Sequence, residues 1–194
     1  MRIVGGQFRG RPLAAPKSTA TRPTSDRVRE AVFNILAHSI PDFGIEGAKV
    51  LDLFAGTGAL GIEALSRGAA FCMFVEEDAA ARGTISENVE AFGLTGITKI
   101  FRRDASALGD AGKYGGFTLL FADPPYDKDL PRKTLASASA GGWLTAGAVC
   151  VLEDRAGSDI DLPANYDRLD TRTWGDTQVV FARYSGSAAN SGSE

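Results

Sequence analysis

The fold is decided by one stretch of the chain, Val50-Leu51-Asp52-Leu53-Phe54-Ala55-Gly56-Thr57-Gly58-Ala59-Leu60-Gly61. It runs from an apolar strand through a glycine-rich turn into residues that favour a helix. The glycines let the backbone turn tightly and let a ligand lie against it, because a Cβ at these positions would obstruct both. The stretch matches the G-x-G-x-x-G pattern of nucleotide-binding turns, which also occurs where nothing binds.

Downstream of this turn, short apolar runs alternate with helical patterns. Strands are expected at residues 50–53, 71–75, 98–102, 117–122 and 148–152, a hairpin at 166–173 and 179–184, and helices at 59–67, 79–92 and around 133–140. Runs that are apolar throughout fit strands buried on both faces. The alternation predicts an α/β fold in which a mostly parallel sheet is covered by helices on both faces.

The start of the chain carries a charge opposite to that of the rest. Residues 1–30 hold seven Lys or Arg and two acids, a net charge of +5, whereas the whole chain has −3 and the remainder therefore −8. A basic arm on an acidic body favours an anionic partner, with nucleic acid the obvious candidate. A solvated basic face has the same composition and stays an alternative.

Within this arm, residues 2–9 predict a small β-hairpin around Gly5-Gly6. Residues 26–37 predict a helix capped by Thr24 or Ser25, with an apolar stripe that packs on the main domain. Three arginines near the start of this helix or on its wetter side are expected to be available to phosphate or substrate: Arg22, Arg27 and Arg29.

Composition limits the classes of protein that need to be considered. With 194 residues and 44% hydrophobic content, the chain can form one substantial core. We expect an N-terminal extension at 1–40, one main domain at 41–184 and a disordered tail at 185–194. No run of about 18 apolar residues is present, which predicts a soluble, cytoplasmic protein without a membrane partner. Two cysteines in apolar runs indicate buried thiols, and a single histidine makes a metal site improbable.

Two acids near the glycine turn limit which ligands it could bind. Glu76 ends the second strand, 20 residues beyond Gly56, where an acid accepts hydrogen bonds from ribose hydroxyls. Such a position suits both NAD and S-adenosylmethionine. Asp52 stands just before the turn, where its carboxylate would oppose a pyrophosphate but favour the cationic amino group of a methionine moiety. A loop-capping role for Asp52 remains the alternative.

The segment Asp123-Pro124-Pro125-Tyr126 follows the fourth strand. Two consecutive prolines hold the backbone extended and stiff, so the acid and the aromatic ring are presented in fixed geometry. The carboxylate of Asp123 and the carbonyl of Pro124 could accept the N–H groups of an amine-bearing base while Tyr126 stacks on its face. A rigid turn capped by an acid is the alternative for a match this short.

Several motifs in order resemble known families. Residues 52–61, Glu76, Asp104 and 123–126 resemble the motifs of class I S-adenosylmethionine-dependent methyltransferases of the amino-methylating type. The N-terminal part is similar to that of the bacterial 16S ribosomal RNA guanine-N2 methyltransferase family, in Arg2-Ile3-Val4-Gly5-Gly6, Phe8-Arg9-Gly10-Arg11, Arg22-Pro23-Thr24, Asp26-Arg27-Val28-Arg29-Glu30 and Phe33-Asn34. The similarity spans nearly the whole chain, to about Tyr184.

This resemblance implies a Rossmann-like, seven-stranded sheet with its last strand antiparallel, plus a small N-terminal hairpin and helix. It implies S-adenosylmethionine as cofactor and 16S rRNA, or the 30S subunit or its assembly intermediate, as partner. We also expect a monomer without a metal. The implied cofactor-binding residues are Asp52, Gly56 and Gly58 at the methionine end, Glu76 at the ribose, Asp104 and Ala105 at the adenine, and the turn residues Phe54, Ala55 and Thr57. The implied catalytic residues, which would hold a flipped guanine, are Asp123, Pro124, Pro125 and Tyr126. The implied RNA contacts are Arg9, Arg11, Arg22, Thr24 and Arg27.

Other functions fit parts of the same pattern. The glycine turn by itself permits an NAD(P)-binding oxidoreductase, and the basic arm permits a nucleic-acid-binding module without catalysis. Amino-methyltransferases that act on DNA adenine or protein glutamine use similar Pro-Pro-Tyr segments. The resemblance of the N-terminal part favours ribosomal RNA.

Overall fold

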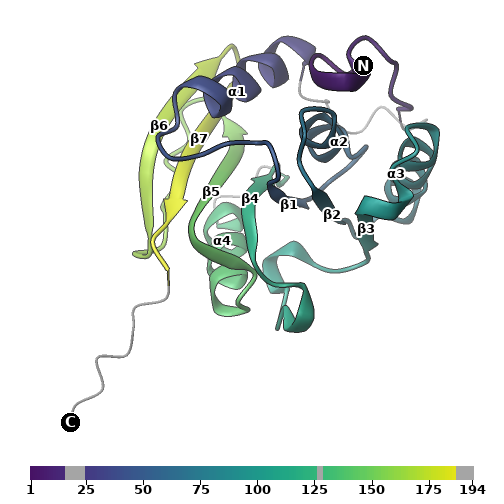
Figure 1. Ribbon diagram of the computed structural model, residues 1–194. Helices are drawn as coiled ribbons and strands as arrows, with labels where there is room; N and C mark the ends of the chain where they lie inside the picture. Colours follow the sequence, from purple (N-terminus) through teal and green to yellow (C-terminus); the bar gives the residue numbers. More distant parts are fainter. Residues whose placement is uncertain (16–24, 126–128, 187–194) are drawn as a thin grey trace.

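The computed structural model describes residues 1–15, 25–125 and 129–186. Its centre is a seven-stranded sheet in the order β3-β2-β1-β4-β5-β7-β6 (Figure 1). The strands are β1 (Lys49–Leu53), β2 (Phe71–Val75), β3 (Thr98–Phe101), β4 (Phe117–Ala122), β5 (Leu144–Arg155), β6 (Tyr166–Trp174) and β7 (Thr177–Tyr184). Strands β1 to β5 are parallel, and β7 is antiparallel to both β5 and β6. The strand order reverses beside β1, a point where open α/β sheets commonly bind ligands.

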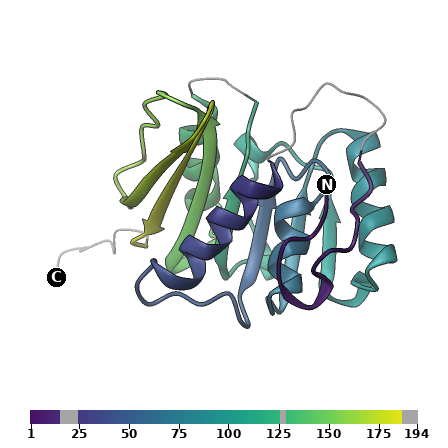
Figure 2. The same ribbon diagram turned by 90° about the horizontal axis from the view of Figure 1, so that it is seen from above.

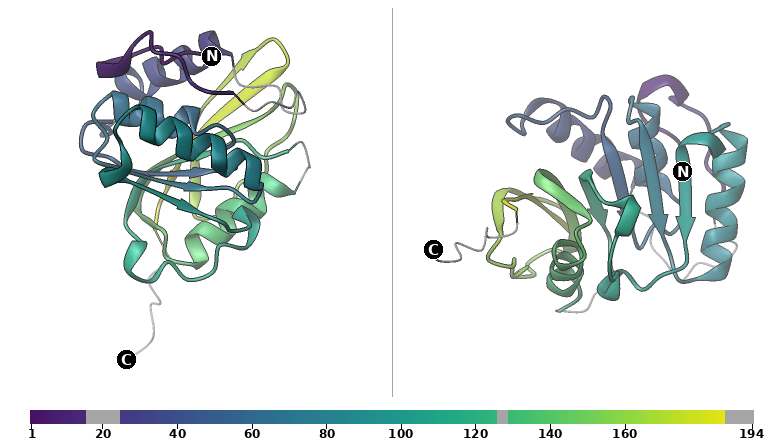
Figure 3. Two further views of the ribbon diagram at one scale, coloured as in Figure 1. Left: turned by 90° about the vertical axis from the view of Figure 1, so that its right-hand side faces the viewer. Right: turned by 60° about the horizontal axis from the view of Figure 1, so that its bottom comes forward.

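Helices cover both faces of this sheet, as the sequence predicts. They are α1 (Asp26–His38), α2 (Ala59–Ser66), α3 (Ala79–Ala91) and α4 (Leu130–Ala140), with 3₁₀ turns at Gly6–Phe8, Thr95–Ile97, Ala105–Ala107 and Gly112–Tyr114. Apolar residues of α1, α2, α3 and the N-terminal segment form a core on one face, and those of α4 form a second core on the other. Figure 2 shows α1 crossing the strands and the N-terminal segment running beside α2, and Figure 3 shows α3 along the β3 side of the sheet.

The local elements form for the reasons that the sequence indicates. The Ser25 side chain caps α1 by accepting a hydrogen bond from the Val28 amide, and β2 is buried along nearly its whole length. Both cysteines are buried thiols. Strand β5 is longer than the expected residues 148–152, because its polar end at 153–155 pairs with β7 although the apolar run has stopped. None of the helices in the described ranges is long and apolar enough to cross a membrane.

The predicted N-terminal hairpin is wrong. Residues 2–9 do not form two strands around Gly5-Gly6, because residues 6–8 form a 3₁₀ turn. The two sides of the longer segment 1–13 are joined by an isolated bridge between Arg2 and Pro12 and by backbone hydrogen bonds of Ile3 with Gly10 and Arg11 and of Leu13 with Met1. Helix α2 supplies polar partners that a second strand would otherwise provide: the Ser66 hydroxyl donates to the Gly5 carbonyl at 2.7 Å and accepts from the Phe8 amide at 2.9 Å. The segment therefore docks on α2 and closes on itself in a loop wider than the predicted hairpin.

Candidate active site

The glycine turn begins directly after β1 and contains residues with positive φ. These angles are 54° at Phe54, 55° at Gly56 and 76° at Gly58, which is also the N-cap of α2. Left-handed backbone at a residue as bulky as phenylalanine costs about 1–3 kcal/mol. The Ala55 amide donates to the Val75 carbonyl at 3.2 Å, so β2 helps to hold the turn. Strain is thus stored in the predicted cofactor-binding turn.

Asp52 lies beneath this turn and is 2% exposed. Its carboxyl accepts a hydrogen bond from the Gly61 amide at 2.9 Å, in the first turn of α2. The pKa of Asp52 is raised to about 8, chiefly by burial and also by the Glu76 carboxylate, whereas the Gly61 hydrogen bond opposes the shift. The contact with Gly61 fits the alternative in which Asp52 caps the turn, and its cofactor role stays a prediction.

Gly61 has a packing role, in addition to the turn and ligand roles that the sequence predicts for the glycines. A Cβ built at Gly61 would lie 2.4 Å from a ring carbon of Phe74 and 2.5 Å from the Cys72 sulfur. Glycine therefore allows α2 to pack closely on β1 and β2, the third role in the G-x-G-x-x-G pattern.

Glu76 follows β2 and reaches back to the glycine turn. One of its carboxylate oxygens accepts from the Gly56 amide at 2.9 Å, and the other accepts from the Asp78 amide at 2.9 Å. Glu76 thus contacts the glycine turn directly, and its predicted role at a ribose stays a prediction. Because a carboxylate oxygen can accept more than one hydrogen bond, Glu76 retains capacity for a ligand hydroxyl.

Asp104 and Ala105 follow β3 at the same edge of the sheet. The Asp104 carboxylate accepts from the amide and the hydroxyl of Ser106, each at 2.7 Å, and so caps the short turn at Ala105–Ala107. Asp104 is exposed and Ala105 is buried. A contact of either residue with adenine stays a prediction.

Asp123 follows β4 and lies among acids that sequence reasoning missed. Burial raises the pKa of Asp123 well above its usual range, and the carboxylates of Glu153, Asp52 and Asp154 raise it further. Ala122 pairs with Leu152 in the β4–β5 register, which brings Asp123 beside the polar end of β5. The only available signal was the Glu-Asp pair at the end of the fifth apolar run.

The predicted segment after β4 is described only in part. Pro124 is buried and Pro125 is exposed, whereas Tyr126 lies outside the described residues. Burial of the first proline fixes the direction in which the segment leaves the sheet.

The predicted RNA-contacting residues differ in exposure and in the contacts that they make. Arg9 and Arg27 are exposed, and Arg22 and Thr24 lie outside the described residues, as do residues 187–194 of the expected tail. Arg11 is exposed but donates to the Ala91 carbonyl at 2.6 Å, and its guanidinium lies 4.3 Å from the centre of the Phe92 ring. Arg11 thus has a structural role in holding the arm on the end of α3.

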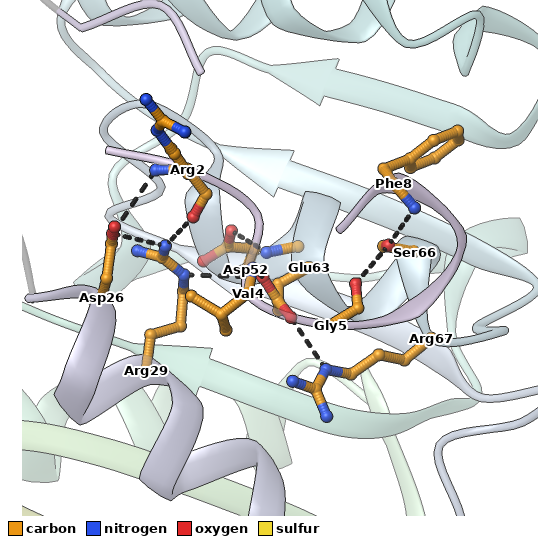
Figure 4. Close-up of polar contacts among 11 residues, drawn as sticks. Arg2, Val4, Gly5, Phe8, Asp26, Arg29, Asp52, Glu63, Ser66 and Arg67 are labelled. Carbon is orange, nitrogen blue, oxygen red and sulfur yellow. Dashed lines mark hydrogen bonds and ion pairs between the residues drawn. The ribbon is translucent and has the colours of Figure 1, made fainter. Parts of the chain in front are cut away.

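Arg29 is fully buried, which contradicts the expectation that it is available to phosphate or substrate. Its guanidinium donates to the carbonyl of Arg2 and to the carboxylate of Asp26, and its Nε lies 3.6 Å from Glu63 (Figure 4). Glu63, also buried, accepts from the Val4 amide at 2.8 Å and pairs with Arg67 at 2.8 Å. This polar cluster joins α1 and the N-terminal segment to α2, which starts at the glycine turn.

A metal site has no support in this arrangement. Within residues 1–15, 25–125 and 129–186, no group of three or more His, Cys, Asp or Glu side chains could hold a metal ion.

Comparison with known proteins gives a family and similar relatives. The family described as "Conserved hypothetical protein 95" matches residues 1–183. The "Putative rRNA methyltransferase YlbH" of Bacillus subtilis is 39% identical over 192 residues and covers 96% of this chain and 100% of its own. The "Ribosomal RNA small subunit methyltransferase D" of Escherichia coli is 36% identical over 185 residues, with 95% and 89% covered.

A solved structure, described as "Putative methyltransferase yhhF from Escherichia coli", superposes with a TM-score of 0.81. It is 31% identical, and the match covers 96% of this chain and 99% of that one. The likeness confirms the expected class I methyltransferase fold.

Proposed function

The chain belongs to the family described as "Conserved hypothetical protein 95", and we propose that it transfers a methyl group from S-adenosylmethionine to the exocyclic N2 of a guanine in 16S ribosomal RNA. One observation carries this proposal. Strands β1 and β4 are neighbours, with Leu53 opposite Ala122, so the glycine turn and the Asp123-Pro124-Pro125 segment leave the sheet side by side. A methyl donor on the turn and an amine on the segment would therefore meet.

The described residues fit S-adenosylmethionine, the methyl donor of methyltransferases with this fold. A Cβ built at Gly56 has no neighbour closer than 3.9 Å, which leaves room against the turn. Glu76 offers a carboxylate to ribose hydroxyls. An ammonium group would lower the raised pKa of Asp52, and the ionised carboxylate would then offer it negative charge. NAD would bring a pyrophosphate toward the same acid, which disfavours the oxidoreductase alternative.

The electrostatics of the site suit an amine nucleophile. Bound S-adenosylmethionine supplies an electrophilic methyl group on a positively charged sulfur. The carboxyl groups of Asp123, Glu153 and Asp154 stabilise positive charge as it builds up on the attacking nitrogen. The methylated nitrogen must then lose a proton. Burial raises the pKa of Asp123, so its ionised form is a stronger base than an exposed aspartate. The positive charge of a bound methyl donor would favour that ionised form, which could then accept the proton.

RNA as the substrate is supported by the relatives and by the basic arm. Similar proteins bear the names of ribosomal RNA methyltransferases, and exposed Arg9 and Arg27 lie on the arm and on α1. A guanine in helical RNA must leave its stack before its amine can reach a site at the edge of the sheet, at a cost of a few kcal/mol. Arginine contacts to phosphates would offset part of this cost.

The proposal is tested by transfer of a labelled methyl group from S-adenosylmethionine. Undermethylated small ribosomal subunits, free 16S rRNA and duplex DNA are offered in parallel. We expect transfer to ribosomal RNA and a loss of at least about 100-fold in Asp123→Ala, with affinity for S-adenosylhomocysteine retained. Glu87→Ala, at an exposed acid in α3, serves as control. Transfer only to DNA, or binding of NADH in place of S-adenosylmethionine, would overturn the proposal.

A further inference from the structure

Asn88 joins the N-terminal arm to the glycine turn through one buried amide. It lies in α3 and is 1% exposed. Its side-chain oxygen accepts from the Ala14 amide at 2.7 Å, and its nitrogen donates to the Ala14 carbonyl at 3.2 Å and to the Thr57 carbonyl at 3.0 Å. These partners are 74 and 31 residues away in the sequence.

The donor capacity of this amide is fully used by the two segments. An asparagine side chain has two N–H groups, and here one is directed to Ala14 and one to Thr57. If the Thr57 carbonyl turned away, a buried N–H would lose its partner, which is unfavourable. The position of the turn in which the Thr57 carbonyl accepts from Asn88 and the docked position of Ala14 therefore stabilise each other.

The two segments that Asn88 joins both belong to the proposed reaction. Thr57 lies between the glycines of the cofactor turn, and Ala14 directly precedes the segment that carries Arg22 and Thr24, the predicted substrate contacts. The Arg11 contact with the end of α3 docks the arm on the same helix. The path from one segment to the other is a single side chain.

We propose that Asn88 is a positioning residue that couples occupancy of the cofactor turn to docking of the N-terminal arm, so that cofactor and RNA bind cooperatively. This inference rests on the proposed function for its RNA partner. A ligand that fixes the turn keeps the Thr57 carbonyl in place, so the amide of Asn88 holds Ala14 for a larger fraction of the time. By reciprocity, RNA that orders the arm strengthens binding of the cofactor to the same degree.

The first test uses the unaltered full-length chain. Hydrogen exchange at the Ala14 amide, which donates directly to Asn88, is measured with and without S-adenosylhomocysteine. We expect exchange to slow by about five-fold or more, in the range typical of coupled sites. Unchanged exchange at Ala14 with the ligand bound overturns this inference alone. Failure of the ligand to bind at all overturns the proposed function together with it.

The second test measures 16S rRNA affinity with and without S-adenosylhomocysteine in matched variants. Asn88→Asp keeps the shape and the acceptor for the Ala14 amide but removes both donors, and we expect the ratio of the two affinities to fall from about five-fold or more to near one. Ser66→Ala removes arm contacts to Gly5 and Phe8 without touching Thr57. It should weaken RNA binding yet keep the ratio.

The ratio separates positioning from a merely structural role, because a general loosening of the arm lowers both affinities together. An Asn88→Asp ratio equal to that of the wild type overturns the proposal, as does loss of the ratio in Ser66→Ala. If Asn88→Asp does not fold, the hydrogen-exchange measurement on the unaltered chain still tests whether ligand binding at the turn is coupled to Ala14.

Discussion

Replacing Asp52 by asparagine should change two properties in opposite directions: the protein should become more stable at alkaline pH and should bind the cofactor more weakly. The carboxyl is buried under the glycine turn, and burial raises its pKa to about 8. An unfolded chain has an aspartate pKa of about 3.9. Because the folded pKa is the higher one, the folded state holds the proton more tightly, and the stability from this group is full below pH ~4 and lost as the pH rises through ~8.

The size of the effect follows from these two values. Between pH ~5 and pH ~8, ionisation of this group removes roughly 3 kcal/mol from the free energy of unfolding. Asp52→Asn keeps an oxygen for the Gly61 amide but cannot ionise. We expect the variant to be more stable than the wild type at pH ~8, with an advantage that shrinks toward pH ~5. Urea denaturation of both proteins at the two pH values measures this difference.

The same substitution should weaken cofactor binding. A lost charge-assisted hydrogen bond costs about 1.5–3 kcal/mol, which corresponds to at least about ten-fold in the dissociation constant of S-adenosylhomocysteine. In the wild type, an ammonium group near Asp52 would lower its pKa, so binding below pH ~8 should release a proton and tighten as the pH rises. Titration calorimetry in buffers of different ionisation enthalpy detects that proton. A variant that binds as tightly as the wild type, or a stability difference independent of pH, would refute the reasoning.

Three further substitutions test other parts of the structure. Gly61→Ala places a Cβ 2.4 Å from a core aromatic ring and should lower the free energy of unfolding by about 1–3 kcal/mol. Its control is Gly83→Ala in α3, where nothing lies within 4 Å of the new Cβ, and this change should raise the free energy of unfolding by about 0.5–1 kcal/mol. Glu63→Gln removes the buried anion between Arg29 and Arg67, leaving Arg29 only the partly exposed Asp26, and should cost about 3–5 kcal/mol in urea denaturation. Asp161→Asn, in an exposed ion pair, should cost less than about 1 kcal/mol. Glu76→Gln should weaken S-adenosylhomocysteine binding by about ten-fold without changing the fold, and equal affinity in calorimetry would count against its ribose contact.

Most of the fold could be predicted because local patterns and tertiary structure agree. The apolar run at 71–75 is the strand β2 with the same bounds, and Gly93 ends α3 with a positive φ of 70°. The tight N-terminal hairpin was wrong for the opposite reason: two glycines and alternating residues suit a hairpin locally, but Ser66 of α2 bonds Gly5 and Phe8, and the segment closes in a wider loop. Nothing in residues 2–9 reveals that partner.

In the candidate site, too, some residues could be predicted from local sequence patterns and others could not. Glu76 could be placed because its distance from Gly56 reflects the length of one β-α-β connection, and the contact between the two is present. Arg29 could not, since its burial depends on Glu63, which lies on another helix. Asn88 carries no local signal either, because both of its partners are distant in the sequence.

The most direct test of the central claim is the identity of the methylated nucleoside. Small ribosomal subunits or 16S rRNA, methylated by this protein with S-adenosylmethionine, are digested and the nucleosides separated by mass spectrometry. The proposed function predicts a single product, N2-methylguanosine, and its loss with Asp123→Ala, because the glycine turn and the Asp123 segment leave the sheet side by side. Methylated adenosine, or no methylated nucleoside at all, would contradict it.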